Sequence, residues 1–367
     1  MNAENFAQPH LLKQPIYVTG KPIAYTAREF GLDPAQIDKL ASNENPLGPS
    51  PKGIAAAAKA LAEVNLYPDG GCYDLIGHIG EFRKVNRDQV VVGNGSNELL
   101  DLIAKVFLGP GTEAIMGSHG FAVYKLATLV QNATPVEIPM PAPDFNLSLA
   151  AVREAITEKT RVIFIANPNN PTGTELSAKE LLDFARSIPE NVVLVLDEAY
   201  TEFIEEDAPD FLPLIEEGLP IICCRTFSKI YGLAGLRCGY AITRPDIASL
   251  IHRVREPFNV NSLAQAAAQA ALGDQEYVAH VRKANAEGLK QLSEGFKSLG
   301  LPYIPSRANF IVVLGVKEPT KAFEFLQKKG TIVRPQRAMG DALRVTVGTK
   351  EQNERFLRNL SDYLKSL

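Results

Sequence analysis

The sequence lacks the features that mark membrane-spanning, exported and metal-binding proteins. No apolar run among its 367 residues approaches the roughly 18 residues that a membrane span needs. The N-terminal stretch has neither an apolar core nor an Arg-rich amphipathic pattern, so we expect no export signal. The five histidines are scattered, without HxxxH or HxH spacing. We therefore expect no metal site and no contact with a membrane.

Cysteines and like-charge clusters are also scarce. The four cysteines form no CxxC pair, and Cys223 and Cys224 lie inside the apolar run "LPIICC". This pattern predicts buried, reduced thiols and a cytoplasmic location. The net charge is −4, from 38 basic and 42 acidic residues, and no run of like charges stands out. We expect neither a nucleic-acid-binding surface nor a disordered tail.

Two nucleotide-binding fingerprints are absent as well. The chain contains neither GxxxxGK[ST], which cradles nucleotide phosphates, nor GxGxxG, which marks dinucleotide-binding turns. ATP-binding and NAD-binding enzymes are therefore disfavoured.

The middle of the chain shows a regular alternation of strands and helices. Strands are predicted at 89–93, 113–117, 134–138, 161–166, 191–197, 220–224 and 238–242, and helices near 96–108, 121–131, 148–157, 177–187 and 245–254. The strands are apolar throughout, which is typical of a sheet covered on both faces. We expect an α/β fold with a mostly parallel sheet and helices on both faces.

The pattern changes after residue 258. Long helical stretches (262–272 and 274–299) lead to a smaller set of strands and helices, which predicts a second, α+β domain. A chain of this length suggests about two domains. We expect residues 1–40 to form an N-terminal arm and part of the small domain. Residues 41–258 would form the large domain and 259–367 the small C-terminal domain.

The stretch "VVVGNGSNELL" predicts a strand, a tight turn and the start of a helix. Gly93 and Gly95 allow close approach of the backbone, and Ser96 or Asn97 would cap the helix. The first amides of the helix would then form a cradle for a phosphate. Taken alone, the turn is weak evidence for a phosphate site, because such turns more often only cap a helix.

Two further turns follow apolar strands. In "VLVLDEAY", Asp197 ends a strand, at the edge where open α/β sheets bind ligands. It could cap the next helix, or it could pair with a protonated ring nitrogen such as that of pyridoxal phosphate. Tyr200 could donate a hydrogen bond to the oxygen of such a ring. In "ANPNNPTG", two prolines stiffen a turn around Asn170, which is either a plain loop or a device that positions this amide.

The stretch "RTFSKIYGLAGLRCGY" surrounds one lysine with phosphate-binding residue types. Lys229 follows Thr226 and Ser228 and precedes Arg237, with three glycines between and beyond them. A lone lysine after a strand is usually solvated. A lysine that attacks an aldehyde must lose its proton, which partial burial and nearby cations favour. The presence of Asp197, Asn170 and Arg237 in similar turns favours a lysine that attacks an aldehyde.

These stretches together resemble the fold type I pyridoxal-phosphate enzymes and, within them, the histidinol-phosphate aminotransferases. The resemblance covers nearly the whole chain and rests on the following strings: "YVTGKPI", "LASNENPLGPSP", "YPD", "GNGSNE", "NPNNPTGT", "LDEAY", "RTFSKIYGLAGLRCGY", "PFNVN", "ANF", "IVRP" and "LRVTVGT". It implies that the large domain binds the cofactor pyridoxal 5'-phosphate. It also implies a homodimer with shared active sites.

The resemblance assigns roles to residues of the cofactor site. Lys229 would form the Schiff base and move the substrate proton, while Asp197 would keep the pyridine nitrogen protonated. Asn170 and Tyr200 would bond the ring oxygen. The phosphate would be held by Ser96, Asn97, Thr226, Ser228 and Arg237, together with Tyr67 of the partner subunit. The position that stacks on the ring, commonly tyrosine in a YxxY pattern, holds Phe121 in "HGFAVY", which keeps stacking but removes a hydroxyl.

The resemblance also indicates a substrate site and a reaction. Arg344 matches the arginine that binds a substrate anion, and Arg334 offers a second cation, with a surface strand position as its alternative. Tyr25 and Asn45 complete the expected substrate contacts. The implied reaction is transamination between L-histidinol phosphate and 2-oxoglutarate in histidine biosynthesis.

Other readings compete with this one. An aromatic-amino-acid aminotransferase and, more distantly, a threonine-phosphate decarboxylase could use the same scaffold. A non-catalytic binding domain is disfavoured because Lys229 is present.

Overall fold

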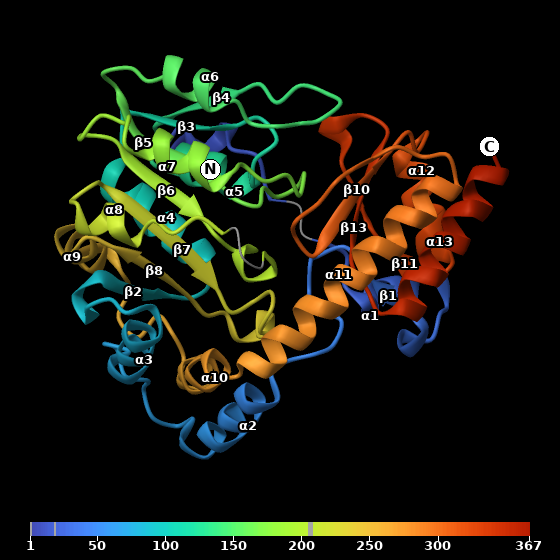
Figure 1. Cartoon of the computed structure of the whole chain (residues 1–367), viewed down its shortest axis with the longest axis horizontal. Coiled ribbons are helices and arrows are strands. Elements are labelled where there is room, and N and C mark those ends of the chain that lie inside the picture. The colour runs from blue at the N-terminus through green and yellow to red at the C-terminus, as the bar shows by residue number, and fades with distance from the viewer. Residues whose placement is uncertain (1, 18–19, 205–207) are drawn as a thin grey trace.

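The computed structural model describes residues 2–17, 20–204 and 208–367. Its largest sheet has seven strands in the order β2-β8-β7-β6-β5-β3-β4 (Figure 1). The strands are β2 (Val90–Gly93), β3 (Glu113–Gly117), β4 (Thr134–Ile138), β5 (Thr160–Ala166), β6 (Val193–Asp197), β7 (Ile221–Thr226) and β8 (Gly239–Thr243). Only β8 runs antiparallel to its neighbours, β2 and β7. The prediction of a mostly parallel α/β sheet is confirmed.

Helices cover both faces of this sheet, as the apolar strands predicted. Along β6, Val193 and Val195 face one core, while Leu194 and Leu196 face another, because side chains alternate along a strand. The helices on or beside the sheet are α2 (Pro51–Ala60), α3 (Tyr73–Arg83), α4 (Ser96–Phe107), α5 (Ala122–Val130), α6 (Leu149–Glu154), α7 (Ala178–Ala185), α8 (Leu212–Glu216), α9 (Pro245–Val254) and α10 (Ser262–Leu272). Helices α4, α5 and α9 bury side chains in one core and α3, α7, α8 and α10 in the other.

A second, antiparallel sheet lies beyond the end of the large one. Its order is β12-β13-β10-β9, with β9 (Tyr303–Ile304), β10 (Phe310–Leu314), β12 (Arg334–Pro335) and β13 (Ala342–Thr346). The long helix α11 (Gln275–Ser298) reaches from the large sheet to this one, where α12 (Pro319–Lys328) and α13 (Lys350–Lys365) also pack (Figure 1). Phe296, Leu326 and Phe356 from these three helices share one core.

The stretch "GTIVRP" contributes to two sheets rather than to one. It divides into β11 (Thr331–Ile332), which pairs in parallel with β1 (Asp38–Lys39), and β12, which pairs with β13. The partner β1 comes from nearly 300 residues earlier in the chain, so no local pattern shows the change of partner. Helix α1 (Ile23–Phe30), which the sequence analysis passed over, packs Ala27 beside Ile37 and Ile332.

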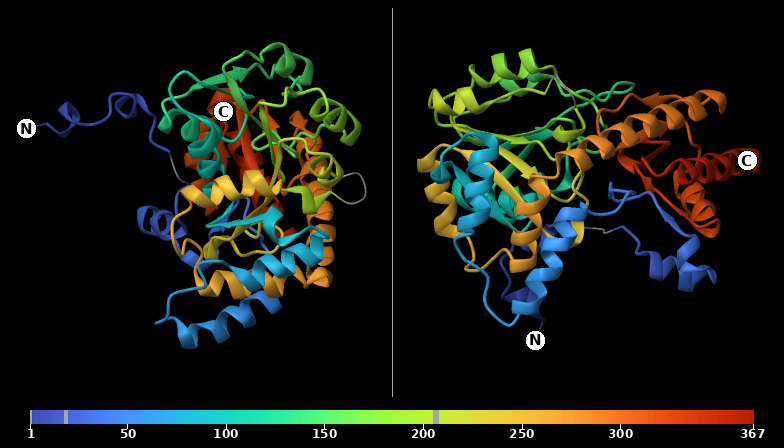
Figure 2. Two further views of the ribbon diagram at one scale, coloured as in Figure 1. Left: turned by 90° about the vertical axis from the view of Figure 1, so that its left-hand side faces the viewer. Right: turned by 60° about the horizontal axis from the view of Figure 1, so that its bottom comes forward.

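Short 3₁₀ turns connect several of these elements. They are η1 (Ala3–Asn5), η2 (Leu11–Lys13), η3 (Pro34–Gln36), η4 (Leu61–Glu63), η5 (Arg87–Gln89), η6 (Thr201–Phe203), η7 (Ala234–Leu236) and η8 (Arg337–Met339). The segment that carries η1 and η2 extends away from the rest of the chain (Figure 2). Its few contacts include a hydrogen bond between the His10 ring and the carbonyl of Val130.

Other sequence expectations concern side chains and segments rather than topology. All four cysteines are buried and free of disulfides. Across the described ranges, no helix combines the length and apolarity needed to cross a bilayer. Within the same ranges, no cluster of three or more His, Cys, Asp or Glu side chains is placed to hold a metal ion.

Candidate active site

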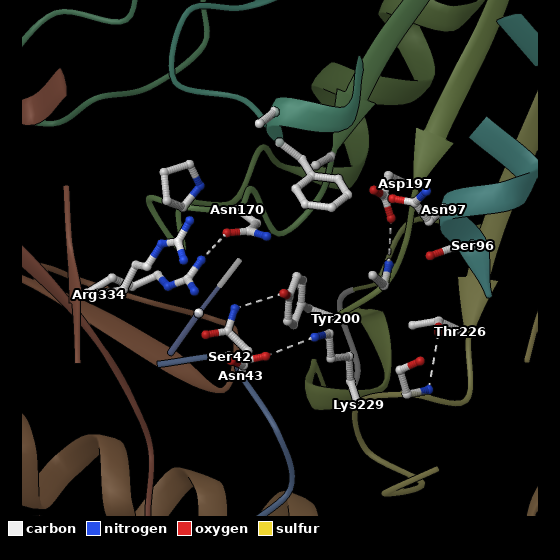
Figure 3. Close-up of a pocket in the computed structure, with 18 of the residues that line it drawn as sticks. Ser42, Asn43, Ser96, Asn97, Asn170, Asp197, Tyr200, Thr226, Lys229 and Arg334 are labelled. Atoms are coloured by element: carbon white, nitrogen blue, oxygen red, sulfur yellow. Dashed lines mark hydrogen bonds between the residues drawn. The ribbon is translucent and has the colours of Figure 1, made fainter. Parts of the chain in front are cut away.

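Most of the predicted site residues line one cavity of about 310 Å³ at the edge of the large sheet. Strands β5, β6 and β7 end at this edge. Strand β2 also ends there, because β8 lies between β2 and β7 and runs antiparallel to both. The predicted residues on its walls are Ser96, Asn97, Phe121, Asn170, Asp197, Tyr200, Thr226, Ser228, Lys229, Arg237, Arg334 and Arg344. Figure 3 shows many of them around a common space, with Arg334 at one side and Ser96, Asn97 and Thr226 at the other.

The turn before α4 forms one end of this cavity. Gly95 has a φ of +81°, and a Cβ atom there would lie 2.4 Å from the Nη2 atom of Arg237. A Cβ on Gly239 would lie 2.5 Å from the amide nitrogen of Ser96. Only glycine permits both approaches. The first amides of the twelve-residue helix α4 therefore lie beside the guanidinium of Arg237, which makes this end attractive to anions.

Hydroxyl groups complete the same end. The Oγ1 atom of Thr226 accepts a hydrogen bond from the amide of Ser228 at 3.1 Å, and the Oγ atom of Ser228 accepts one from Arg237 at 3.3 Å. Arg237 itself adopts a left-handed φ of +60°, which turns its side chain back toward Ser228. The set offers amides, hydroxyls and one cation, the donors that a phosphate prefers.

Asp197 is buried at the end of β6 and receives two hydrogen bonds. The hydroxyl of Tyr124 donates to its Oδ2 atom at 2.7 Å, and the amide of Ala199 donates to Oδ1 at 3.2 Å. Burial raises the pKa of Asp197, while these donors and the nearby Lys229 oppose the rise. The sequence analysis missed Tyr124. The only signal was its place one helical turn after Phe121, which puts both on one side of α5.

Lys229 is half-buried and turned into the cavity rather than to solvent. Its Nζ atom donates to the carbonyl of Ser42 at 3.3 Å and lies 5.7 Å from the centre of the Tyr200 ring (Figure 3). Burial, followed by the positive charge of Arg344, lowers its pKa from 10.5 to about 8. Such an amine loses its proton far more readily than a surface lysine does.

Tyr200 is anchored by a residue that the sequence analysis also missed. Asn43 donates from Nδ2 to the Tyr200 hydroxyl at 2.9 Å, and its own backbone amide donates to the Oγ1 atom of Thr346 at 2.9 Å. Burial raises the pKa of Tyr200 to about 12, so its hydroxyl keeps its proton at neutral pH. Asn43 comes from "LASNENPLGPSP", a stretch in which only Asn45 had been singled out.

Two arginines form the opposite end of the cavity. Arg344 donates from Nη1 to Oδ1 of Asn170 at 2.6 Å and from Nη2 to the carbonyl of Ala41 at 2.7 Å. Its buried Nε atom has no hydrogen-bond partner within the described part of the chain. Burial, with a further contribution from the charge of Arg334, lowers its pKa to about 10. Two guanidinium groups close together favour an anion between them.

Three predicted residues lie outside this cavity. Asn45 donates to the carbonyl of Ile230 and to the hydroxyl of Tyr277, and it lines a different cavity. Tyr25, on α1, is 57% exposed, and Tyr67 is 83% exposed. Their assigned roles stay predictions, and for Tyr67 the predicted site belongs to a partner subunit.

The structure adds Tyr17, Ser42 and Gln336 to the cavity wall. Tyr17 opens the stretch "YVTGKPI", in which residues 18 and 19 lie outside the described part of the chain. Tyr17 and Tyr25 both belong to the N-terminal stretch, and it is Tyr17 that the fold brings to the arginine end. No local pattern distinguishes the two tyrosines, because the choice depends on how distant parts of the chain pack together.

Comparison with known families identifies the scaffold. The family described as "Aminotransferase class I and II" matches residues 35–360. The chain belongs to this family. Relatives of this aminotransferase include histidinol-phosphate aminotransferase 2 of Pseudomonas fluorescens, 48% identical with 98% of this chain and 97% of the relative covered. The histidinol-phosphate aminotransferase of Methylobacillus flagellatus is also 48% identical, with 99% and 98% covered.

Solved structures agree with the family. The histidinol-phosphate aminotransferase of Sinorhizobium meliloti, solved in complex with pyridoxal-5'-phosphate, has a TM-score of 0.88 and 26% identity, with 98% of each chain covered. The aspartate aminotransferase of Thermus thermophilus with maleate has a TM-score of 0.83 at 22% identity, with 97% and 99% covered. At that identity the second likeness concerns the fold alone.

Proposed function

We propose that this aminotransferase uses pyridoxal 5'-phosphate to transfer the amino group of L-histidinol phosphate to 2-oxoglutarate. The products are imidazole-acetol phosphate and L-glutamate, and the reaction serves histidine biosynthesis. The observation that carries the proposal is a single cavity with a cationic phosphate cradle at one end and two arginines at the other. The near-full-length similarity to histidinol-phosphate aminotransferases supports the same substrate.

The residues of the cavity fit pyridoxal phosphate. The absence of side chains at Gly95 and Gly239 lets the guanidinium of Arg237 and the amide of Ser96 approach closely, and Arg237 and Ser96 line the same end of the cavity. Asp197 is a buried acid that an opposing cation would stabilise. Lys229 lies on the wall of the same cavity with a pKa near 8. When bound, the cofactor supplies an electron sink for the charge that develops at the substrate Cα atom.

The side chains of this aminotransferase would divide the remaining work. The Nζ atom of Lys229 would take a proton from the substrate and return it, which an amine with a pKa near neutrality does efficiently. Asp197 would hold a proton on the ring nitrogen, and Phe121 would pack against the ring. Asn170 and Tyr200 would orient the ring through its oxygen.

The arginine end would bind the substrate anion. Arg344 and Arg334 present planar guanidinium groups, which bind a phosphate or a carboxylate by paired hydrogen bonds. Histidinol phosphate offers a phosphate and 2-oxoglutarate offers a carboxylate, so one pair of arginines serves both substrates in turn. Tyr17 and Gln336 line the same end and could donate to either anion.

A homodimer with shared sites is part of the proposal. Tyr67 is 83% exposed and stacks on Phe258, with ring centres 4.8 Å apart. Exposed apolar side chains precede it along α2, η4 and the residues that follow η4, namely Ile54, Leu61, Val64 and Leu66. A surface of this kind is typical of a protein–protein interface. The N-terminal segment that extends from the body (Figure 2) could reach a second subunit as well.

A donor comparison tests the substrate assignment. With 2-oxoglutarate as acceptor, we expect kcat/KM for L-histidinol phosphate to exceed that for L-phenylalanine by at least about a hundredfold, the value of charge-assisted hydrogen bonds to the phosphate. Release of carbon dioxide from threonine phosphate is measured in parallel. Faster turnover of phenylalanine would make the protein an aromatic aminotransferase, and carbon dioxide release would make it a decarboxylase.

Mixing two inactive variants tests the shared site. Lys229→Ala and Tyr67→Ala are each expected to be impaired alone, because each removes a group from every site of its own homodimer. A mixed dimer regains one intact site, so a refolded equimolar mixture should recover about a quarter of the wild-type activity if the dimer is two-fold symmetric. A mixture no more active than the mean of its components would contradict shared sites.

A further inference from the structure

The hydroxyl of Tyr124 is buried against the carboxylate of Asp197, and the proposed reaction gives it no part. We propose that Tyr124 is a positioning residue that keeps Asp197 ionised and fixed in orientation, and thereby keeps the bound cofactor's ring nitrogen protonated. This inference rests on the proposed cofactor. It adds a residue that neither touches the substrate nor lines the cavity.

The ring of Tyr124 is held on several sides. It lies parallel to the ring of Phe164 on β5, with centres 5.0 Å apart and planes 2° apart, and Phe121 meets it edge-on at 5.8 Å. The hydroxyl of Thr128 donates to the Tyr124 carbonyl at 2.7 Å. With 1% of its surface exposed, Tyr124 has no room to turn away. Its hydroxyl can therefore act as a preorganised donor rather than as a mobile contact.

The hydrogen bond from Tyr124 compensates the buried carboxylate of Asp197. Asp197 is only 5% exposed, and an ionised carboxylate with so little water must be compensated by donors. Tyr124 donates the shorter of the two hydrogen bonds to Asp197, at 2.7 Å to Oδ2 against 3.2 Å from the amide of Ala199 to Oδ1. The Tyr124 hydroxyl reaches Asp197 from α5, whereas the Ala199 amide belongs to the turn that follows β6. The two donors together fix the plane of the carboxylate.

The protonation states are consistent with this direction of donation. Burial and the adjacent Asp197 raise the pKa of Tyr124 well above its ordinary value, so the phenol keeps its proton. Burial raises the pKa of Asp197, and the Tyr124 hydrogen bond is the largest contribution that opposes it. Lys229 also stabilises the carboxylate, whereas Glu198 destabilises it. Without the Tyr124 hydroxyl, a proton would reside more often on Asp197 and less often on the ring nitrogen it faces.

The Tyr124→Phe variant isolates the hydroxyl, because the ring and its stacking on Phe164 are retained. Tyr363→Phe is the matched control. Tyr363 lies on α13 and is also buried, within the core of the second sheet. Its hydroxyl donates to the carbonyl of Lys317 at 2.8 Å. Both variants remove a hydroxyl that donates to a protein oxygen at a similar distance, and the Tyr363 hydroxyl also donates to the carbonyl of Glu318 at 3.3 Å, so a general loss of stability would affect both.

The decisive measurement is the ¹⁵N NMR shift of the ring nitrogen in enzyme loaded with ¹⁵N-labelled pyridoxal phosphate. We expect a protonated nitrogen in the wild type and in Tyr363→Phe, and a shift toward the unprotonated value in Tyr124→Phe. If Tyr124→Phe does not fold, enzyme with 3-fluorotyrosine at position 124, a stronger donor, is expected to hold the nitrogen at least as fully protonated as the wild type. An unchanged shift in Tyr124→Phe, or loss of the protonated signal with fluorotyrosine, would overturn the inference.

A cofactor analogue gives a kinetic check. N-methyl pyridoxal phosphate carries a permanent positive charge on its ring nitrogen and does not depend on Asp197 for it. We expect Tyr124→Phe to lower kcat/KM about tenfold with pyridoxal phosphate, as for a change of one unit in pKa, and to lower it much less with the analogue. Equal losses with both cofactors would show that Tyr124 is only structural. Failure of the wild type to bind pyridoxal phosphate would refute the proposed function instead.

Discussion

The two ends of the active-site cavity are built in different ways. The proposed cofactor end consists of Ser96, Asn97, Asp197, Thr226, Ser228, Lys229 and Arg237, which lie at strand ends, at the start of α4 or in turns along one edge of the large sheet. The proposed substrate end contains Tyr17, Arg334 and Arg344, which come from the two extremes of the chain. The contacts that join these two parts of the chain include the pairing of β1 with β11 and the hydrogen bonds from Asn43 to Thr346 and from Arg344 to the carbonyl of Ala41.

Because the two ends are built differently, the residues at the substrate end can change without altering those at the cofactor end. The strand ends of one sheet hold the cofactor end in a rigid frame. The substrate end depends on the packing of the second sheet and of the N-terminal segment against that frame. Changes at the first end should therefore reduce kcat, and changes at the second should mainly alter KM.

The largest effect is expected from Lys229→Ala. Loss of the amine removes the proton acceptor, so turnover should fall by roughly 10⁴-fold or more, while the cradle still binds pyridoxal phosphate noncovalently. Steady-state assays and equilibrium dialysis measure the two quantities. Lys179→Ala, which removes an exposed lysine paired with Asp183, is the control and should behave as the wild type. Substantial turnover in Lys229→Ala would refute the assignment.

Asp197→Asn should have the next largest effect. The amide is similar in size but carries no charge, so it cannot hold the ring nitrogen in its protonated form, and kcat should fall about 10²- to 10³-fold. KM for histidinol phosphate should change little, because the substrate end is untouched. A change in KM without a change in kcat would contradict the prediction that substitutions at the cofactor end reduce kcat.

Arg344→Gln tests the substrate end. Loss of the charged fork should raise KM for histidinol phosphate about ten- to a hundredfold, while the affinity for pyridoxal phosphate stays near the wild-type value. Arg344→Lys should recover only part of the loss, since lysine cannot form paired bonds. Arg307→Gln, which removes an arginine bonded to Glu175 outside the cavity, serves as the control. Loss of cofactor from Arg344→Gln would show that the two ends are not separable.

The pKa of Lys229 predicts how the apoenzyme takes up its cofactor. The pKa is lowered to about 8, so the amine is charged below pH 8 and neutral, hence nucleophilic, above it. The rate of covalent uptake should fall about tenfold for each pH unit below 8 and level off above it. Stopped-flow absorbance between pH 6.5 and 9.5, roughly the range around this pKa, measures the profile. A midpoint near 10.5, the ordinary lysine value, would contradict burial of the amine.

Phe121→Tyr should have the smallest effect. Phenylalanine and tyrosine offer similar faces for stacking, so kcat and KM should stay within about twofold, whereas Phe121→Ala should lose up to about tenfold in cofactor affinity. A large gain from Phe121→Tyr would show that the hydroxyl, absent here, has a role at this position.

The cofactor end could be predicted from the sequence because each of its turns is local. An apolar strand followed by glycine, serine or aspartate places those side chains at the sheet edge whatever the rest of the chain does. Lys229, Asp197 and Arg237 were identified in this way, and the structure places all three on one cavity wall. The division into domains and the assigned roles at these positions stay predictions.

The substrate end and the supporting contacts were decided by the tertiary structure. Asn43 rather than Asn45, and Tyr17 rather than Tyr25, line the cavity, and Tyr124 bonds to Asp197 from a helix 73 residues away in sequence. Each choice depends on the direction in which one side chain points when two distant segments pack together. A sequence determines which residues follow each strand, but the distance between segments that pack across a cavity exists only in the folded chain.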